Sequence, residues 1–139
     1  MHKIVIIGGG HAAAQIVTSL RLHKLTPDHG YQTTLISSEP HLPYQRPPLS
    51  KAYLKGELTA ERLLIQRDTA YESAGVTLKL GVDATALNAE KRTVTIQSPA
   101  GTADLAYDTL ILATGGHARA LNCPGGALTG IYSVRTLKD

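Results

Sequence analysis

The stretch that decides the fold is KIVIIGGGHAAA, residues 3–14. Four consecutive β-branched residues run directly into three glycines. Residues 3–10 therefore indicate a buried strand of a parallel sheet, apolar on both faces. From His11 onward the apolar residues recur with helical spacing, and the predicted helix runs to about Leu25. A second strand, QTTLISSE at 32–39, completes a βαβ unit.

The glycines form the pattern G-x-G-x-x-A over residues 8–13. Gly8 permits a tight turn out of the strand, Gly10 lets a pyrophosphate approach the backbone, and Ala13 keeps helix and strand close. The start of the helix then offers free N–H groups and the positive end of its dipole to phosphates. Because the pattern follows a strand and opens a helix, it predicts a dinucleotide site. The alternative is an ordinary glycine-rich turn.

An acidic residue, Glu39, lies at the end of the second predicted strand, where a ribose-binding carboxylate belongs. No arginine follows at once to receive a 2′-phosphate. We therefore expect an adenosine ribose with free hydroxyls, as in FAD or NAD. The alternative is a solvated acid at a strand end.

The rest of the chain departs from a plain repeat of βαβ units. A proline-rich loop, LPYQRPPLSK at 42–51, follows the second strand. We then expect a short helix at the start of 50–56 and a second helix at 68–75, with Asp68 as its N-cap and Gly75 as its stop. A strand should follow at 76–80, then an antiparallel meander at 84–88, 92–97 and 103–107, and a buried strand at 108–116. Residues 117–139 should be irregular except for a strand at 131–134. The predicted fold class is α/β: a Rossmann-like parallel sheet with a small antiparallel β-meander inserted.

Composition narrows the class of protein further. The chain has 139 residues, enough for one domain or part of one, and its 42% hydrophobic and 18% charged residues exclude a disordered chain. A net charge of +3 is too small for a nucleic-acid binder. No apolar run is long enough to span a membrane, so we expect a cytoplasmic protein. The single Cys123 excludes an internal disulfide, and the six histidines show no metal-ligand spacing.

Four segments carry a family resemblance that covers essentially the whole chain: VIIGGGHAAA (5–14), RPPLSKAYL (46–54), YDTLILATGG (107–116) and YSVRTLKD (132–139). The chain resembles the FAD-binding half of the pyridine-nucleotide-dependent flavoprotein reductases. Within them it is similar to the ferredoxin reductase components of bacterial oxygenase systems, the rubredoxin and putidaredoxin reductase type. The first and third segments are widespread among flavoproteins, whereas RPPLSK and the final RTLKD are narrower signatures.

The resemblance implies FAD as the cofactor and a role for each matching residue. Gly8, Gly10 and Ala12 would line the pyrophosphate, next to Ala13. Ser38 and Glu39 would contact the adenosine ribose, and Ala84 would contact the adenine. The flavin ring would be contacted by Arg46, Pro47 and Lys51, residues Ala113, Thr114 and Gly115 would run beside the flavin, and Arg135 would hold the cofactor from the last segment. Lys51 is the predicted catalytic residue, because a cation near the ring stabilises the negative charge of reduced flavin. Arg119 is left open between a phosphate contact and the surface.

The implied function is transfer of electrons from NAD(P)H through the flavin to a ferredoxin-type iron–sulfur protein. The proline loop contains no cysteine, which argues against the thiol chemistry of disulfide reductases. Residues 1–139 would be the N-terminal segment of the FAD-binding domain, an incomplete FAD/NAD(P)-binding fold without the NAD-binding and C-terminal interface domains and not competent alone for NADH turnover. Two alternatives stay open: an apoptosis-inducing-factor-like NADH oxidoreductase, and a non-catalytic flavin- or nucleotide-binding module.

Overall fold

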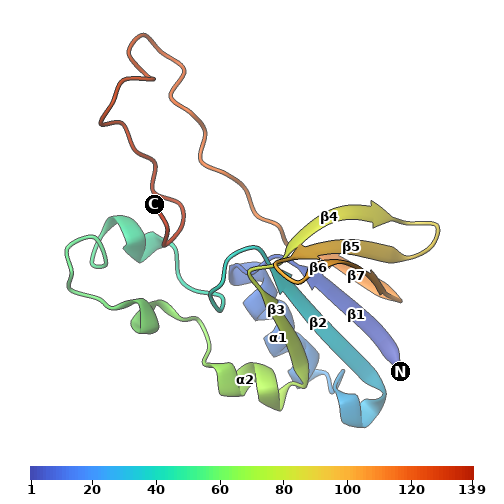
Figure 1. The fold of residues 1–139 in the computed structure, drawn as a ribbon. Helices are drawn as coiled ribbons and strands as arrows, with labels where there is room; N and C mark the ends of the chain where they lie inside the picture. The colour runs from blue at the N-terminus through green and yellow to red at the C-terminus, as the bar shows by residue number, and fades with distance from the viewer.

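The computed structural model describes residues 1–139 and contains two sheets, with the strand orders β3-β2-β1-β7 and β4-β5-β6 (Figure 1). The strands are β1 (His2–Ile7), β2 (Tyr31–Ser37), β3 (Val76–Leu80), β4 (Asp83–Asn88), β5 (Thr93–Ser98), β6 (Gly101–Ala106) and β7 (Thr109–Leu112). The helices are α1 (His11–Leu22) and α2 (Asp68–Ser73), with single 3-10 turns at Pro27–His29, Pro47–Ser50 and Ala60–Leu63. No helix is both long and apolar enough to cross a membrane.

The larger sheet is parallel throughout. Strand β1 pairs with β2 on one side and β7 on the other, and β2 pairs with β3. Strands β4, β5 and β6 form the antiparallel meander. The predicted α/β class, with a Rossmann-like βαβ unit and an inserted meander, is confirmed. A parallel pair requires a crossover, and α1 supplies it between β1 and β2.

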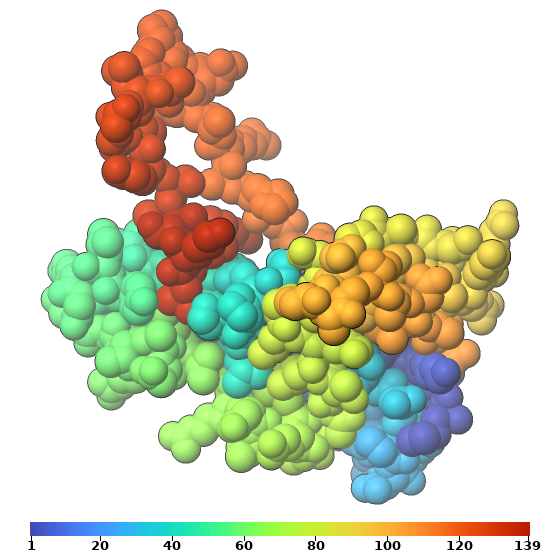
Figure 2. Space-filling model, viewed as in Figure 1, coloured from blue at the N-terminus to red at the C-terminus, as the bar shows by residue number.

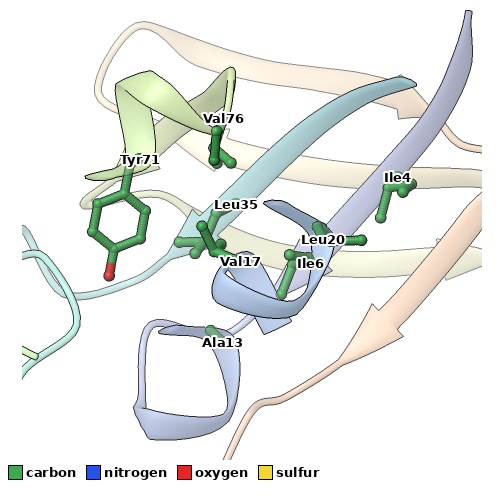
Figure 3. Packing of buried hydrophobic residues seen from close by; sticks show 9 residues of the cluster. Ile4, Ile6, Ala13, Val17, Leu20, Leu35, Tyr71 and Val76 are labelled. Carbon is green, nitrogen blue, oxygen red and sulfur yellow. The ribbon is translucent and has the colours of Figure 1, made fainter. Parts of the chain in front are cut away.

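The parallel sheet is covered on both faces, as its continuous apolar strands require. Ile4 and Ile6 of β1 face α1 and α2 and join a cluster that we call the central core; its nine residues are Ile4, Ile6, Ala13, Val17, Leu20, Leu35, Tyr71, Ala74 and Val76 (Figure 3). Val5, between them in sequence, faces the opposite side and packs with Val94 and Ile96 of the meander. The two-residue period of a strand thus gives three layers, with helices, parallel sheet and meander in that order (Figure 1).

The proline loop builds a small core of its own, which we call the loop core: Tyr44, Leu49 and Leu63. Backbone hydrogen bonds from Gln45 N–H to Leu63 O and from Ile65 N–H to Pro43 O join the loop to the segment after the Ala60–Leu63 turn. The loop core lies beside the sheet and is not part of it. Leu137, near the C-terminus, packs against it.

Residues 117–134 form an irregular C-terminal arm that rises from the body and returns to it (Figure 2). The predicted strand at 131–134 is wrong. Its alternating pattern has no neighbouring strand to pair with, and all four residues are exposed. The N-cap of α2 is also corrected, because Arg67 takes that position and the Asp68 carboxylate accepts the N–H of Thr69 from inside the helix. Gly75, with a φ of 65°, follows the helix end as expected.

Candidate functional site

A cleft of about 1140 Å³ opens at the carboxyl ends of the parallel strands. All four strands contribute to it through the residues that follow them: 8–10 after β1, 38–39 after β2, 82–84 after β3 and 113–116 after β7. Ligands of open α/β sheets bind at this edge. Arg46 and Pro47 of the proline loop and residues 134–136 close the cleft from the side.

The glycine turn after β1 is shaped by close approaches of the backbone. Gly8 has a φ of 125°, and a Cβ there would overlap the carbonyl oxygen of Ala113. A Cβ on Gly9 would overlap the hydroxyl of Ser37. Gly10 differs, because its φ is negative and no atom lies within 4 Å of the position that a Cβ would take. The first two glycines are needed for the fold, whereas the third leaves space open to the cleft.

Helix α1 begins at that open space. Gly10 is its N-cap residue, no side chain caps the helix, and no acidic residue lies in the first turn. The first N–H groups of a helix have no partner within it, and its dipole places partial positive charge there. His11 and Ala12 line the cleft at this point. The arrangement fits a phosphate group and contains no carboxylate that would repel one.

The side of the cleft next to β2 carries a polar cluster, the Tyr44 network. Glu39 accepts a hydrogen bond from Arg46 Nη2 at 2.5 Å on Oε1, and one from the Tyr44 hydroxyl on Oε2. Arg46 Nη1 also donates to the Tyr44 hydroxyl at 3.1 Å and to Arg135 O at 2.8 Å. The N–H of Leu137 donates to the same hydroxyl at 3.0 Å. The network joins Glu39, the proline loop and the C-terminal segment.

Burial and charge act together on Tyr44. Its side chain is only 1% exposed, and burial together with the hydrogen bond to Glu39 raises the pKa of the phenol above its ordinary value. The hydroxyl therefore stays protonated and continues to donate to the carboxylate. The Arg46 guanidinium also lies over the Tyr44 ring, 5.0 Å from its centroid.

Arg135 anchors the C-terminal segment at the side of the cleft. Its Nε donates to Gly116 O at 3.0 Å, and this hydrogen bond joins the two ends of the C-terminal arm. Asp139 accepts the N–H groups of Thr136 and Arg135 and closes a turn over the last residues. These N–H groups lower the pKa of the Asp139 carboxyl.

The structure brings together twelve of the fourteen residues that the sequence predicted for the cofactor. The cleft is lined by Gly8, Gly10, Ala12, Ser38, Glu39, Arg46, Pro47, Ala84, Ala113, Thr114, Gly115 and Arg135. Ala13 is instead fully buried in the central core, in keeping with its predicted role between helix and strand. Lys51 lies outside the lining, where its Nζ donates to Pro47 O at 3.3 Å. Arg119 is exposed in the C-terminal arm, away from the cleft.

Sequence reasoning missed several polar residues of the lining. Ser37, Asp83, His117 and Thr136 belong to it, and His11 does so from the end of the glycine turn. All but His117 directly adjoin a residue that was predicted, and His117 lies two positions after Gly115, so position near a strand end was the available signal. No group of three His, Cys, Asp or Glu side chains gathers in a way that could hold a metal ion, and Cys123 is free and exposed.

Comparison with protein-family models gives a match over residues 2–139 to the pyridine nucleotide-disulphide oxidoreductase family. Among curated proteins, the chain is 42% identical over 97% of its length to the 5,5′-dehydrodivanillate O-demethylase ferredoxin reductase subunit of Sphingobium sp.. It is 37% identical over 96% of its length to rhodocoxin reductase of Rhodococcus erythropolis. The matched region covers 31% and 30% of these relatives, so the chain spans about a third of their length.

Solved structures agree with the observed fold. The ferredoxin reductase for the CYP199A2 system from Rhodopseudomonas palustris superposes with a TM-score of 0.83 at 33% identity, over 99% of this chain and 32% of that one. The putidaredoxin reductase in its covalent complex with putidaredoxin gives a TM-score of 0.76 at 35% identity, over 87% of this chain and 27% of that one. The likeness therefore extends over almost the whole chain, including the fold that carries the cleft.

Proposed function

Because the chain belongs to the pyridine nucleotide-disulphide oxidoreductase family, we propose that its cleft binds FAD and that the full-length protein passes electrons from NAD(P)H through the flavin to a ferredoxin-type iron–sulfur protein. The observation that carries the proposal is the convergence of twelve expected cofactor residues on one cleft at the carboxyl ends of four parallel strands. The relatives whose names specify ferredoxin or rhodocoxin reductases support the electron acceptor.

The cleft suits two polar groups of FAD, the pyrophosphate and the adenosine ribose. The open space at Gly10 and the uncapped start of α1 suit a pyrophosphate, because neither a Cβ nor a carboxylate occupies them. Glu39 suits the adenosine ribose, because a carboxylate accepts hydrogen bonds from vicinal hydroxyls. FAD, when bound, supplies a centre that takes up a hydride and releases electrons one at a time.

The chain's own residues would bind, orient and tune that cofactor. Residues 113–116 would run beside it, since they follow β7 into the cleft. Arg46 and Arg135 would add positive charge at the side of the cleft that the proline loop and the C-terminal segment close. In this view the parallel sheet places the cofactor, and the proline loop sets the electrostatic field around it.

Lys51 remains the proposed catalytic cation beside the flavin. Its exposed Nζ makes only a 3.3 Å hydrogen bond to Pro47 O, so its flexible stem is free to reorient toward the ring. We expect Lys51→Ala in the full-length protein to lower the flavin reduction potential and to slow hydride transfer about tenfold or more. Lys55→Ala is the matched control, because Lys55 is exposed just after the proline loop and approaches only Glu57, at 4.0 Å. An unchanged potential in Lys51→Ala would remove Lys51 from the site.

The experiment that tests the proposal measures flavin bound per full-length chain, followed by reduction of a ferredoxin driven by NADH or NADPH. We expect about one FAD per chain and reduction of the iron–sulfur protein. A protein that binds no flavin after incubation with FAD would contradict the proposal. A protein that binds FAD and oxidises NADH without reducing any ferredoxin would replace the proposed acceptor.

A pair of glycine variants ties the flavin to the cleft. Gly10→Ala should keep the fold within about 1 kcal/mol, because its Cβ meets open space and its φ is negative, and should weaken FAD binding about tenfold or more. Gly8→Ala should damage the fold itself, since its Cβ would overlap Ala113 and its φ is 125°. Equal FAD affinity in Gly10→Ala and wild type would show that the cofactor lies elsewhere.

A further inference from the structure

The hydroxyl of Tyr44 is the point at which three separate segments meet. It donates to Glu39 Oε2 at the end of β2, and it accepts from Arg46 Nη1 of the proline loop and from Leu137 N–H of the C-terminal segment. The ring beneath it packs in the loop core with Leu49 and Leu63. The phenol thus has a complete set of partners: one acceptor and two donors.

The Glu39 carboxylate is held from behind by these partners. Arg46 occupies Oε1 and Tyr44 occupies Oε2, so each oxygen already receives one hydrogen bond from the protein. A carboxylate accepts about four hydrogen bonds in all, which leaves capacity for about two more. Glu39 lines the cleft and its side chain is 23% exposed, so this capacity is accessible to a ligand.

We propose that Tyr44 is a positioning residue that fixes the Glu39 carboxylate for recognition of an adenosine ribose, and that it couples this recognition to the docking of residues 135–137. The inference rests on the proposed function, because the ribose belongs to the proposed FAD. The two vacant hydrogen-bonding positions match the two hydroxyl donors of a ribose. Tyr44 and Arg46 restrict the torsion angles of the Glu39 side chain before the ligand arrives, which lowers the entropy lost on binding.

Removal of the hydroxyl alone separates this role from packing. Tyr44→Phe keeps the ring in the loop core and under the Arg46 guanidinium. It takes the donor from Glu39 Oε2 and the acceptor from Leu137 N–H. The carboxylate then keeps Arg46 as its one protein partner and rotates more freely in the cleft.

The test measures binding of ADP and of 2′-deoxy-ADP to the full-length apoprotein by calorimetry. ADP carries the adenosine ribose without the flavin, so binding is read independently of turnover. We expect wild type to prefer ADP about tenfold, the size of one hydrogen bond to a charged group, and Tyr44→Phe to reduce the preference to about threefold or less. Tyr53→Phe is the matched control, because Tyr53 packs against the same loop core without joining the network, and it should keep the wild-type preference.

A double-mutant cycle shows whether Tyr44 acts through Glu39. Glu39→Gln should itself reduce the preference for ADP, and Tyr44→Phe in that background should produce no further reduction. A further reduction there would overturn the positioning role. So would an equal preference for ADP in Tyr44→Phe and wild type, and in that outcome the proposed FAD site survives.

Two further outcomes are decisive. A wild-type protein that binds neither ADP nor FAD would overturn the proposed function and this inference with it. If Tyr44→Phe does not fold, Glu39→Asp tests the same geometry, because the shorter side chain draws the carboxylate away from Tyr44 and Arg46. Glu39→Asp should lose the preference for ADP, and a preserved preference would contradict the proposal.

Discussion

The regions around Tyr44 and Tyr71 bury an aromatic ring equally well, with 1% and 0% of the residue exposed, but they treat its hydroxyl differently. The Tyr44 hydroxyl has three polar partners from three segments. The Tyr71 hydroxyl has none, although it is buried. Tyr71 belongs to the central core between α1, α2 and the sheet, whereas Tyr44 lies where the proline loop meets the cleft.

The difference indicates what each region contributes. In the central core the Tyr71 ring contributes apolar packing. Its hydroxyl lowers the stability of the fold, because a buried polar atom without a partner costs free energy. In the Tyr44 network the hydroxyl has the structural role, because it holds the Glu39 carboxylate at the edge of the cleft. The central core stabilises the fold, and the Tyr44 network organises the site.

The largest expected effect comes from removing apolar volume at the centre of the central core. Leu35 is fully buried in β2, and Leu35→Ala should lower the free energy of unfolding by about 3 kcal/mol in chemical denaturation. Leu54→Ala is the control, because Leu54 is 71% exposed and its loss should change stability by less than about 0.5 kcal/mol. A loss below about 1 kcal/mol in Leu35→Ala would contradict the assignment of the central core.

A smaller and more local effect should follow in the Tyr44 network. Arg46→Met removes the hydrogen bonds to Glu39, Tyr44 and Arg135 O but keeps an apolar stem. We expect the free energy of unfolding to fall by about 1–2 kcal/mol, since the Glu39–Arg46 pair is partly exposed. Relative to wild type, amide exchange should accelerate more at Thr136 and Leu137 than in the central core.

Arg62→Met is the control for that variant. Arg62 is exposed in the Ala60–Leu63 turn and forms no ion pair, so its loss should leave the exchange at Leu137 unchanged. If Arg46→Met instead accelerated amide exchange equally in β1 and at Leu137, the central core and the Tyr44 network would unfold as one unit. That result would contradict their separate roles.

The smallest expected effect at neutral pH is that of Tyr71→Phe. Removal of an unpaired hydroxyl should leave the stability within about 0.5 kcal/mol of wild type or raise it slightly. A loss above about 1 kcal/mol would show that the hydroxyl has a partner, such as a buried water.

The same variant should have a clear signature at alkaline pH. Burial raises the pKa of Tyr71 from 10.0 to about 12, so between these values the unfolded chain loses the proton that the folded chain keeps. Stability should therefore fall as the pH rises through this window, and it should fall less steeply in Tyr71→Phe. Stability measured across the window in both proteins checks this sign, and parallel curves would contradict it.

The sequence predicted what depends on local pattern. The glycine turn, the βαβ unit and the meander follow from periodicity and turn residues that are close together in the chain, and the structure confirms them. The boundaries differ by a few residues, since α1 ends at Leu22 and not near Leu25. The strand expected at 131–134 failed, because a strand needs a neighbour and the local pattern does not report one.

The Tyr44 network could not be predicted, because it depends on contacts between distant segments. Arg46 meets Arg135 O across 89 positions of the chain, and Tyr44 meets Leu137 across 93. Glu39 and Arg46 were each predicted to contact the cofactor, but nothing in their spacing indicated that they pair with each other. Lys51 differs, because its partner Pro47 O lies only four residues away, but the sequence pattern does not indicate which way its flexible side chain points.

The most direct test is a crystal structure of the full-length protein with FAD bound. We expect the pyrophosphate at Gly10 and the start of α1. We also expect both ribose hydroxyls within hydrogen-bonding distance of Glu39, with Tyr44 and Arg46 still bonded to the carboxylate. A cofactor bound outside this cleft, or a ribose that displaces Tyr44 and Arg46 from Glu39, would contradict this expectation.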